Sequence, residues 1–456
     1  TILLSGCSRL ENIIRCPYLQ EFESEEMTVA VIVPFRGLRY NVEAIKNLAD
    51  VISPPYDMIT AAEQEQLYRR SPYNLVRLEY GKACSGDRAG DNRYTRAAAD
   101  LEAWLHKKVL LLEDERSIYL YRQGFAIREQ IFHRNGLIAA LKLEPYSGKM
   151  ILPHEDTLPT PKKDRLELLR SCRANFSPIF GLFSDQERLF GDICSRICRE
   201  APLFEFTDRA NNKHTLWKVN GKQELSSLAD LIAPRQVFIA DGHHRYETAL
   251  QFSRESGLQS GPGRGYVLAV LVPLEDPGLV ILPFHRLLSG LGGEQLELLI
   301  KNIDKYFHVA KRGCLEDLDL TRFCSEIASR GRHLPAMGLL LPEGVLLLAL
   351  KERKSPGELD VSLLKRLILE PLFKDAGDLE KHLDFTNSED VARQAVLNGQ
   401  AQAAFLLNPT PIEEVTARAL KGENMPQKST CFYPKLPSGL VIHHFDLSHR
   451  DEGTSG

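Results

Sequence analysis

The sequence predicts a mixed α/β fold, and three observations support this prediction. Short runs of β-branched and aromatic residues alternate with segments of helical periodicity from residue 29 onward. Proline and glycine separate these segments, as at the Pro54-Pro55 pair. The 456 residues are 43% hydrophobic, which is enough for the cores of roughly two or three domains. Such an alternation is typical of a sheet that is covered by helices.

Each element follows from its local pattern. Apolar runs bounded by turn residues predict strands, and apolar residues at helical spacing predict helices, as at Ala97, Leu101 and Trp104. In chain order, we expect a strand at 29–33, helices at 43–50, 60–70 and 93–107, strands at 117–122 and 136–143, helices at 165–172 and 187–200, a strand at 236–240 that leads into a helix, and strands at 266–272 and 279–282. After residue 290 the pattern becomes leucine-rich and helical.

These changes in pattern predict the domain organisation. Residues 1–26 are expected to be a disordered or non-native leader, because Met27 directly precedes the first strand-like run. In chain order we then expect an N-terminal α/β domain at 27–150, a central domain at 151–290, a C-terminal α/β subdomain at 291–442 and a disordered polar tail at 443–456.

Charge and cysteine pattern argue against several classes of function. Lysine and arginine number 57 against 61 aspartates and glutamates, so there is no overall positive charge to hold DNA. The nine cysteines include no CxxC pair, which argues against a structural zinc site and a disulfide framework. No apolar run approaches the ~20 residues of a membrane span. We therefore expect a cytoplasmic protein without a DNA or membrane partner, and the oligomeric state is left open.

One turn carries more chemically active side chains than a structural turn requires. A short apolar run is followed by Asp241, Gly242, His243, His244 and Arg245, and then by helical spacing. A helix that begins after a glycine turn offers free N–H groups to a phosphate. We expect Gly242, His244 and Arg245 to contact phosphate, His243 to act as a base, and Asp241 to bind Mg²⁺ or act as a base. The alternative, an N-cap by Asp241, explains only the aspartate.

A second charged cluster lies in the proline-rich loop at 146–163. His154 and Glu155 are adjacent there, and an imidazole beside a carboxylate suits proton transfer next to an anionic group. The expected phosphate ligands that follow are Lys162, Arg165 and Arg173, and Asn175 is a candidate substrate ligand. The alternative is a charged loop ahead of a helix that Asp164 caps.

The turn at 52–57 is a further candidate for substrate binding. Its two prolines make it rigid, so that it can present Tyr56 and Asp57 to a pocket. Consecutive prolines also occur in plain connectors, which is the alternative.

The segment at 422–429 falls short of the P-loop pattern. Gln427 replaces the second glycine, and Pro426 removes an N–H that a phosphate cradle would use. We therefore reject a P-loop. Lys428 and Ser429 are still expected to reach an anionic ligand, unless this is an ordinary surface loop.

Several of these motifs resemble the bacterial family of domain of unknown function 1015. The resemblance extends over residues 29–441, and the motifs that carry it lie at 34–37, 52–57, 153–155, 162–165, 241–249 and 425–430. The family name implies no activity.

The segment at 241–247 is also similar to the signature of the ParB/sulfiredoxin superfamily, which includes sulfiredoxin, the nucleotide-binding domain of the chromosome-partition protein ParB, and free serine kinases. The resemblance implies a mixed-sheet ParB/sulfiredoxin-like core at 151–290, with additional α/β and helical segments, and a turn whose Arg245 contacts nucleotide phosphates. Sulfiredoxin has its catalytic cysteine where this chain has His243, so sulfinic-acid reduction is excluded. The Asp-Gly-His start resembles the serine-kinase branch.

The leading hypothesis is a phosphotransferase that acts on a small hydroxylated metabolite. It would be a free serine kinase or a phosphoserine phosphatase that uses ATP or ADP with Mg²⁺. His243 or Glu155 would take the proton of the hydroxyl, which requires the two side chains to lie close together. Two alternatives stay open. One is a nucleotide-gated binding or regulatory protein of the ParB type, and the other is a metal-dependent hydrolase that uses His154, Asp241, His243 and His244.

Overall fold

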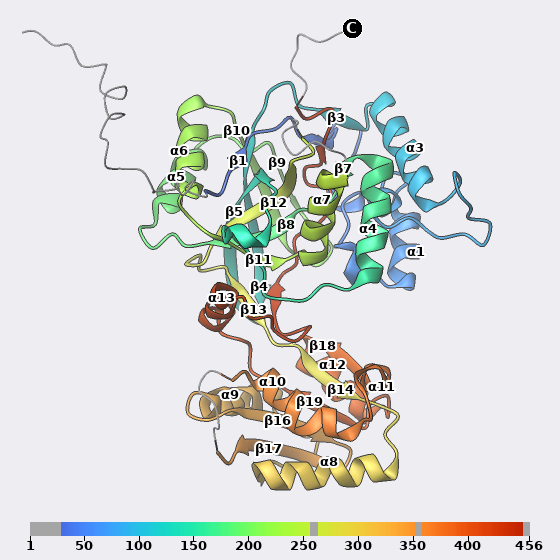
Figure 1. Ribbon diagram of the computed structural model, residues 1–456, viewed down its shortest axis with the longest axis vertical. Coiled ribbons are helices and arrows are strands. Elements are labelled where there is room, and N and C mark those ends of the chain that lie inside the picture. Colours follow the sequence, from blue (N-terminus) through green and yellow to red (C-terminus); the bar gives the residue numbers. More distant parts are fainter. Residues whose placement is uncertain (1–28, 256–262, 353–357, 450–456) are drawn as a thin grey trace, which may run out of the picture.

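The protein has a mixed α/β fold, as the sequence predicts. The computed structural model describes residues 29–255, 263–352 and 358–449. Figure 1 shows a larger body and, below it, a smaller one built from the yellow and orange part of the chain. The expected leader, residues 1–26, lies outside the described residues. None of the helices in the described ranges combines the length and the hydrophobicity that a bilayer span requires.

A nine-stranded mixed sheet forms the centre of the larger body. Its order is β6 (Ile151–Leu152), β11 (Val237–Asp241), β8 (Ile179–Phe183), β12 (Tyr266–Pro273), β5 (Gln130–Lys142), β4 (Ile118–Ile127), β10 (Lys213–Val219) and β9 (Phe204–Thr207), with β1 (Ile32–Val33) also paired to β5. The pairs β6/β11 and β8/β12 are parallel and the other pairs are antiparallel. Because β5 and β6 share this sheet, the expected domain boundary at residue 150 falls inside one folded unit.

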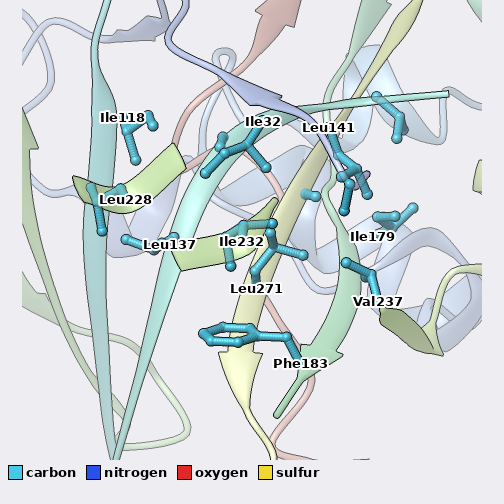
Figure 2. Close-up of a cluster of buried hydrophobic side chains, with 14 of the residues drawn as sticks. Ile32, Ile118, Leu137, Leu141, Ile179, Phe183, Leu228, Ile232, Val237 and Leu271 are labelled. Atoms are coloured by element: carbon cyan, nitrogen blue, oxygen red, sulfur yellow. The ribbon is translucent and has the colours of Figure 1, made fainter. Parts of the chain in front are cut away.

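Four helices cover one face of this sheet. They are α4 (Pro159–Cys172), α5 (Leu189–Ile197), α6 (Lys222–Ile232) and α7 (His243–Glu255). Figure 2 shows part of the core beneath them, where Leu228 and Ile232 of α6 pack near Leu137 and Leu271 of the sheet. These side chains are fully buried, and each contributes about 1.5–3 kcal/mol to folding.

The N-terminal part adds three helices beside the sheet. They are α1 (Ala61–Arg70), α2 (Val76–Glu79) and α3 (Arg93–His106). The strands β2 (Leu38–Tyr40) and β3 (Leu110–Leu112) form an antiparallel pair, and short 3₁₀ turns lie at Leu48–Asp50, Tyr56–Met58 and Tyr146–Gly148. The predicted helix at 43–50 is wrong except for its last turn. The side chains of Asn41 and Asn47 bind the N–H groups of Glu43 and Ala49, and such local bonds compete with a helical ladder.

The C-terminal segment crosses the other face of the large sheet. β20 (Cys431–Tyr433) pairs with β13 (Val280–Leu282), and Phe432 and Val441 pack against Phe180 and Phe238 of the sheet. β21 (His443–His444) then pairs with β7 (Ala174–Asn175). The predicted disordered tail is therefore wrong for residues 443–449, because the ring of Phe445 enters the main core. Residues 450–456 lie outside the described residues.

The smaller body is a six-stranded antiparallel sheet with helices. Its strand order is β15 (Phe307–Lys311), β17 (Gly344–Leu350), β16 (Ala336–Leu341), β19 (Ala403–Leu406), β14 (His285–Leu288) and β18 (Leu383–Thr386). Its helices are α8 (Gly293–Tyr306), α9 (Leu320–Gly331), α10 (Asp360–Leu364), α11 (Ala376–His382) and α12 (Glu389–Leu397). After α10 the chain continues as a π turn at Lys365–Leu369 and a 3₁₀ turn at Glu370–Leu372.

α13 (Ile412–Lys421) joins the two bodies. Val415 packs into the core of the smaller body, and Ala419 packs against the large sheet. The smaller body thus begins at β14, before the expected boundary at residue 291, and the chain returns to the larger body before residue 442. We call residues 285–430 the C-terminal subdomain.

The burial of Phe445 generates a stability prediction. The ring is 1% exposed and packs at a tilt against Phe252, with 5.5 Å between the ring centroids. We expect Phe445→Ala to lower the free energy of unfolding in urea by about 3–5 kcal/mol. Ile131→Ala is the control, because Ile131 is 70% exposed and its loss should change stability by less than about 0.5 kcal/mol. Equal effects in the two variants would contradict the docking of residues 443–449.

Candidate functional site

The loop at 153–158 lies directly against the first turn of α7. The backbone N–H of His154 donates to Nε2 of His243 at 3.3 Å, and the N–H of Leu158 donates to Nε2 of His244 at 2.8 Å. The two clusters that the sequence suggests separately therefore form one site. The two imidazoles serve in part to hold the loop, because each accepts a backbone hydrogen bond from it.

Gly242 allows the sharp entry into α7. Its φ of +91° is in the region that favours glycine, and an added Cβ would lie 3.0 Å from Nε of Arg245. The N–H of Tyr246 makes the first helical bond, to the carbonyl of Gly242 at 2.9 Å. The N–H groups of the first turn thus come before the series of helical hydrogen bonds begins. Together with the helix dipole, they favour an anion at the N-terminus of α7.

Asp241 binds two cations in a largely buried cluster. One carboxylate oxygen accepts from Nη2 of Arg245 at 2.6 Å, and the other accepts from Nζ of Lys435. The three side chains are 10–17% exposed. Burial opposes the ionisation of Asp241, but Lys435 and Arg245 outweigh it and hold its pKa well below the usual range. Asp241 thus offsets part of the positive charge of Arg245 and Lys435 beside the Gly242 turn.

This arrangement does not fit a resident Mg²⁺ on Asp241, as the sequence analysis expects. A magnesium ion is bound by oxygens that are free to face it, and both oxygens of Asp241 already face cations. Within the described ranges, no group of three or more His, Cys, Asp or Glu side chains is arranged to hold a metal ion. The cluster instead fixes the position of two cations.

Glu155 is the carboxylate nearest to His243. Its Oε2 lies 4.0 Å from Nδ1 of His243, and its Oε1 accepts the N–H of Lys428 at 3.2 Å. Burial raises the pKa of Glu155, although Lys428 lowers it in part. Burial lowers the pKa of His243 well below its ordinary value, so the ring is neutral. Because Nε2 accepts the bond from the loop, the proton is on Nδ1, which faces Glu155.

His154 lies behind His243 and away from solvent. The two rings meet edge to face, with 4.7 Å between their centroids, and Nε2 of His154 is 3.2 Å from Oγ1 of Thr430. Burial lowers the pKa of His154 to about 4, so this ring too is neutral. Its surroundings suit a positioning role better than the catalytic role expected from the sequence.

The segment at 425–429 closes the other side of the loop. The N–H of Met425 donates to the carbonyl of His154 at 2.8 Å. Lys428 has a left-handed φ of 58°, and its backbone, held at Glu155, is what reaches the site. Its Nζ lies over the ring of Phe284, 5.5 Å from the centroid. The hydroxyl of Ser429 donates to the carbonyl of Pro426. Neither side chain is placed as the sequence suggests.

Arg286 of the C-terminal subdomain supports this backbone. Its Nη2 donates to the carbonyl of Lys428 at 3.0 Å. The guanidinium is buried, and burial lowers its pKa to about 10. Arg286 thus links β14 to Glu155 through a single residue, Lys428.

Tyr56 and Asp57 also lie next to the cluster. The carboxylate of Asp57 is near enough to Arg245 and Lys435 to stabilise their charges. The guanidinium of Arg165 lies over the ring of Tyr56, 3.9 Å from its centroid, and burial raises the pKa of Tyr56 to about 12. The turn at 52–57 therefore lies beside the Asp241 cluster, and its role in substrate binding stays a prediction.

The remaining candidates divide into two groups. Lys162 borders the site, because its Nζ binds Glu247 of α7 at 3.1 Å. Arg165 and Asn175 line a small cavity together with Arg245. Arg173, by contrast, is at the other end of α4 and pairs with Asp446 of the C-terminal segment at 3.2 Å. Arg173 is thus not among the residues that the fold brings to the turn.

Sequence reasoning missed Lys435. It lies about 190 residues after Asp241 in a stretch that otherwise contains only apolar residues and proline, Tyr433 to Pro437. A single cation in an apolar extended segment is a signal of a buried ion pair, because an isolated buried charge is costly.

Comparison with known proteins agrees with the sequence motifs. The family model described as "Protein of unknown function (DUF1015)" matches residues 32–367, which is more than half of the chain. The chain belongs to this family. No curated protein matches this DUF1015 member.

Several solved structures are similar to this DUF1015 protein at low identity. One is a mutant free serine kinase in complex with ADP, with 14% identity and a TM-score of 0.34, covering 64% of this chain and 90% of that chain. Another is a conserved hypothetical protein from Pyrococcus furiosus, with 14% identity, a TM-score of 0.33 and coverage of 66% and 94%. A third is C-terminally truncated SbnI from Staphylococcus aureus, with 12% identity, a TM-score of 0.35 and coverage of 68% and 90%.

The Asp241 cluster generates a pH-dependent stability prediction. The pKa of Asp241 is depressed in the folded protein, so its contribution to stability is present above the ordinary aspartate pKa of about 3.9 and is lost as the pH falls through the folded pKa. We expect Lys435→Met to lower the free energy of unfolding by about 1.5–3 kcal/mol at neutral pH. The difference from wild type should shrink below the ordinary aspartate pKa.

Urea unfolding of both proteins across this pH range checks the prediction. Lys213→Met is the matched control, because Lys213 forms an exposed ion pair with Glu205 and should change stability by less than about 1 kcal/mol. A Lys435→Met difference that is constant with pH would show that Asp241 is not its partner in the folded state.

Proposed function

We propose that this DUF1015 protein is a phosphotransferase that moves a phosphoryl group between a nucleotide, ATP or ADP, and a small hydroxylated metabolite. One observation carries the proposal. The carboxylate of Glu155 lies 4.0 Å from the neutral ring of His243, at the end of a helix that attracts anions. A partly exposed carboxylate of raised pKa can accept the proton of a hydroxyl, and here it lies beside a turn that is suited to a phosphate.

The phosphate would lie over the Gly242 turn. There the first-turn N–H groups of α7 and the cations Arg245 and Lys435 can face its oxygens. Phosphoryl transfer depends mainly on positioning and on stabilising negative charge, and this cluster offers both. Asp241 acts as a positioning residue, because it fixes both cations without being able to bind the phosphate itself. Mg²⁺ remains part of the proposal as an ion that would arrive on the nucleotide phosphates.

Glu155 would act as the general base. It takes the proton from the acceptor hydroxyl while the hydroxyl oxygen forms a bond to the transferred phosphorus. The bond from phosphorus to the leaving nucleotide oxygen breaks, and that oxygen keeps the electron pair. The Nδ1–H of His243 points toward Glu155 and can orient it. In the reverse direction the same groups would return the proton to the hydroxyl of the product.

Free serine or phosphoserine is the metabolite that we propose first. Tyr56, Asp57 and Asn175 are the proposed contacts, since the first two lie beside the cations and the third lines a small cavity with Arg245. The names of the similar structures include free serine kinases, but the proposal rests on the geometry of the turn.

The direct test supplies the full chain with Mg²⁺, ATP or ADP, and serine, and measures phosphoserine by mass spectrometry. The reverse assay starts from phosphoserine. Formation or loss of phosphoserine that depends on the nucleotide supports the proposal. Nucleotide binding without consumption of any hydroxylated substrate would favour the ParB-type regulatory alternative, and hydrolysis without nucleotide would favour the hydrolase.

The raised pKa of Glu155 generates a prediction for the pH profile. A general base works when it is deprotonated, so kcat/KM should rise with pH, with a midpoint above the ordinary glutamate pKa of about 4.3. We call this rise of kcat/KM with pH the acid limb of the profile. We expect Glu155→Gln to lower kcat by about 10²- to 10⁴-fold and to remove the acid limb. Asp156→Asn, at the neighbouring exposed carboxylate, is the control and should retain the limb. A wild-type profile without an acid limb would exclude Glu155 as the base.

The contact between Arg286 and Lys428 generates a second kinetic prediction. The Lys428 N–H lowers the pKa of Glu155, and Arg286 holds that backbone in place. We expect Arg286→Met to move the acid limb to higher pH, so that kcat/KM falls most at acid pH and recovers at alkaline pH. Arg312→Met, which removes an ion pair with Glu326 in the same subdomain, should leave the limb unchanged. A loss that is uniform with pH would show that Arg286 is only structural.

A further inference from the structure

A second cavity is lined by Lys435 and by no residue of the loop at 153–158. It has a volume of about 350 Å³, which is within the range of small-molecule sites. The turn at 52–58, α1, the turn at 208–212 and the segment 431–437 form its walls. Lys435 lines the cavity and at the same time binds Asp241, so the cavity adjoins the proposed phosphate site.

The exposed surface of the walls is mainly apolar, although Glu63, Arg70, Asp208 and Arg209 also line the cavity. Four prolines and Tyr433 contribute to the lining, and the prolines are Pro54, Pro55, Pro434 and Pro437. The tyrosine ring is planar and the proline rings are apolar, so a planar ring can pack against them. Free serine is a small zwitterion and would leave most of this volume empty.

A residue in the wall of the same cavity carries a buried hydroxyl without a hydrogen-bond partner. Ser53 lines it and is 2% exposed, and its Oγ makes no hydrogen bond. A buried polar atom without a partner costs free energy, which a ligand with a hydrogen-bonding group would recover. Ser438 provides a natural comparison. Its Oγ is also buried and unpartnered, its backbone pairs with that of Ser53, and it does not line the cavity.

We propose that this cavity binds the nucleoside part of the nucleotide. The planar base packs between the proline and tyrosine surfaces, Ser53 hydrogen-bonds to the base or the sugar, and the phosphates pass Lys435 to reach the Gly242 turn. This inference rests on the proposed function, and it assigns the base and the acceptor to different places. The acceptor then binds on the side of Glu155.

Binding calorimetry with ADP, adenosine and tripolyphosphate tests the assignment on the full chain. We expect Ser53→Ala to weaken ADP and adenosine binding by about 2- to 12-fold, the equivalent of one hydrogen bond, and to leave tripolyphosphate binding unchanged. Ser438→Ala is the matched control and should bind all three ligands like the wild type. Arg245→Met should weaken ADP and tripolyphosphate but not adenosine.

A cavity-filling variant gives an independent measurement. Met58 lines the cavity and is 49% exposed, so a larger side chain at this position can enter the cavity without disturbing a core. Met58→Trp should weaken adenosine and ADP binding at least tenfold.

If ADP binding depends on Arg245 but is unchanged by Ser53→Ala and Met58→Trp, the cavity assignment is overturned and the proposed function stands. Loss of serine binding in these two variants would place the acceptor in the cavity and would also overturn the assignment. Absence of ADP binding to the wild type would overturn both proposals.

Discussion

The ion cluster around Asp241 is the interaction on which the rest of the site depends. A single buried carboxylate is bound by Arg245 from the first turn of α7 and by Lys435 from the C-terminal segment. Because buried charges are tolerated only when they are paired, each of the three side chains requires the other two. The cluster therefore fixes the start of α7 to the irregular segment after β20, which comes almost two hundred residues later.

The loop at 153–158 is likewise held in place by contacts from distant parts of the chain. It has no regular secondary structure, and its backbone is held by the imidazoles of His243 and His244 on one side and by the N–H of Met425 on the other. The N–H of Lys428 binds the carboxylate of Glu155 itself. The carboxylate of Glu155 is thus placed by side chains of α7 and by main-chain groups of the segment at 425–428. A loop that is fixed from both sides can present a carboxylate in a defined position, which proton transfer requires.

How much of this could be predicted depended on the range of the interactions. The turn at 241–245 and the pair His154 and Glu155 could be identified because their residue types are unusual over a few positions. Lys435 could not be paired with Asp241, since no local pattern links residues so far apart. The polar composition of the tail hid Phe445, whose burial depends on a core built by other elements. The helix expected at 43–50 fails for a local reason, the asparagine side chains that bind the backbone.

The pairing of β13 with β20 has a consequence for the topology of the chain. The C-terminal subdomain leaves the larger body after β13 and returns at β20, so its two ends lie side by side on one short ladder. In polymer terms it is a closed loop, and the entropy of closing such a loop grows only with the logarithm of its length, by about 0.6 kcal/mol for each doubling. Material could therefore be inserted into or removed from the subdomain at little cost to the larger body, provided that Arg286 and the segment at 425–428 are kept.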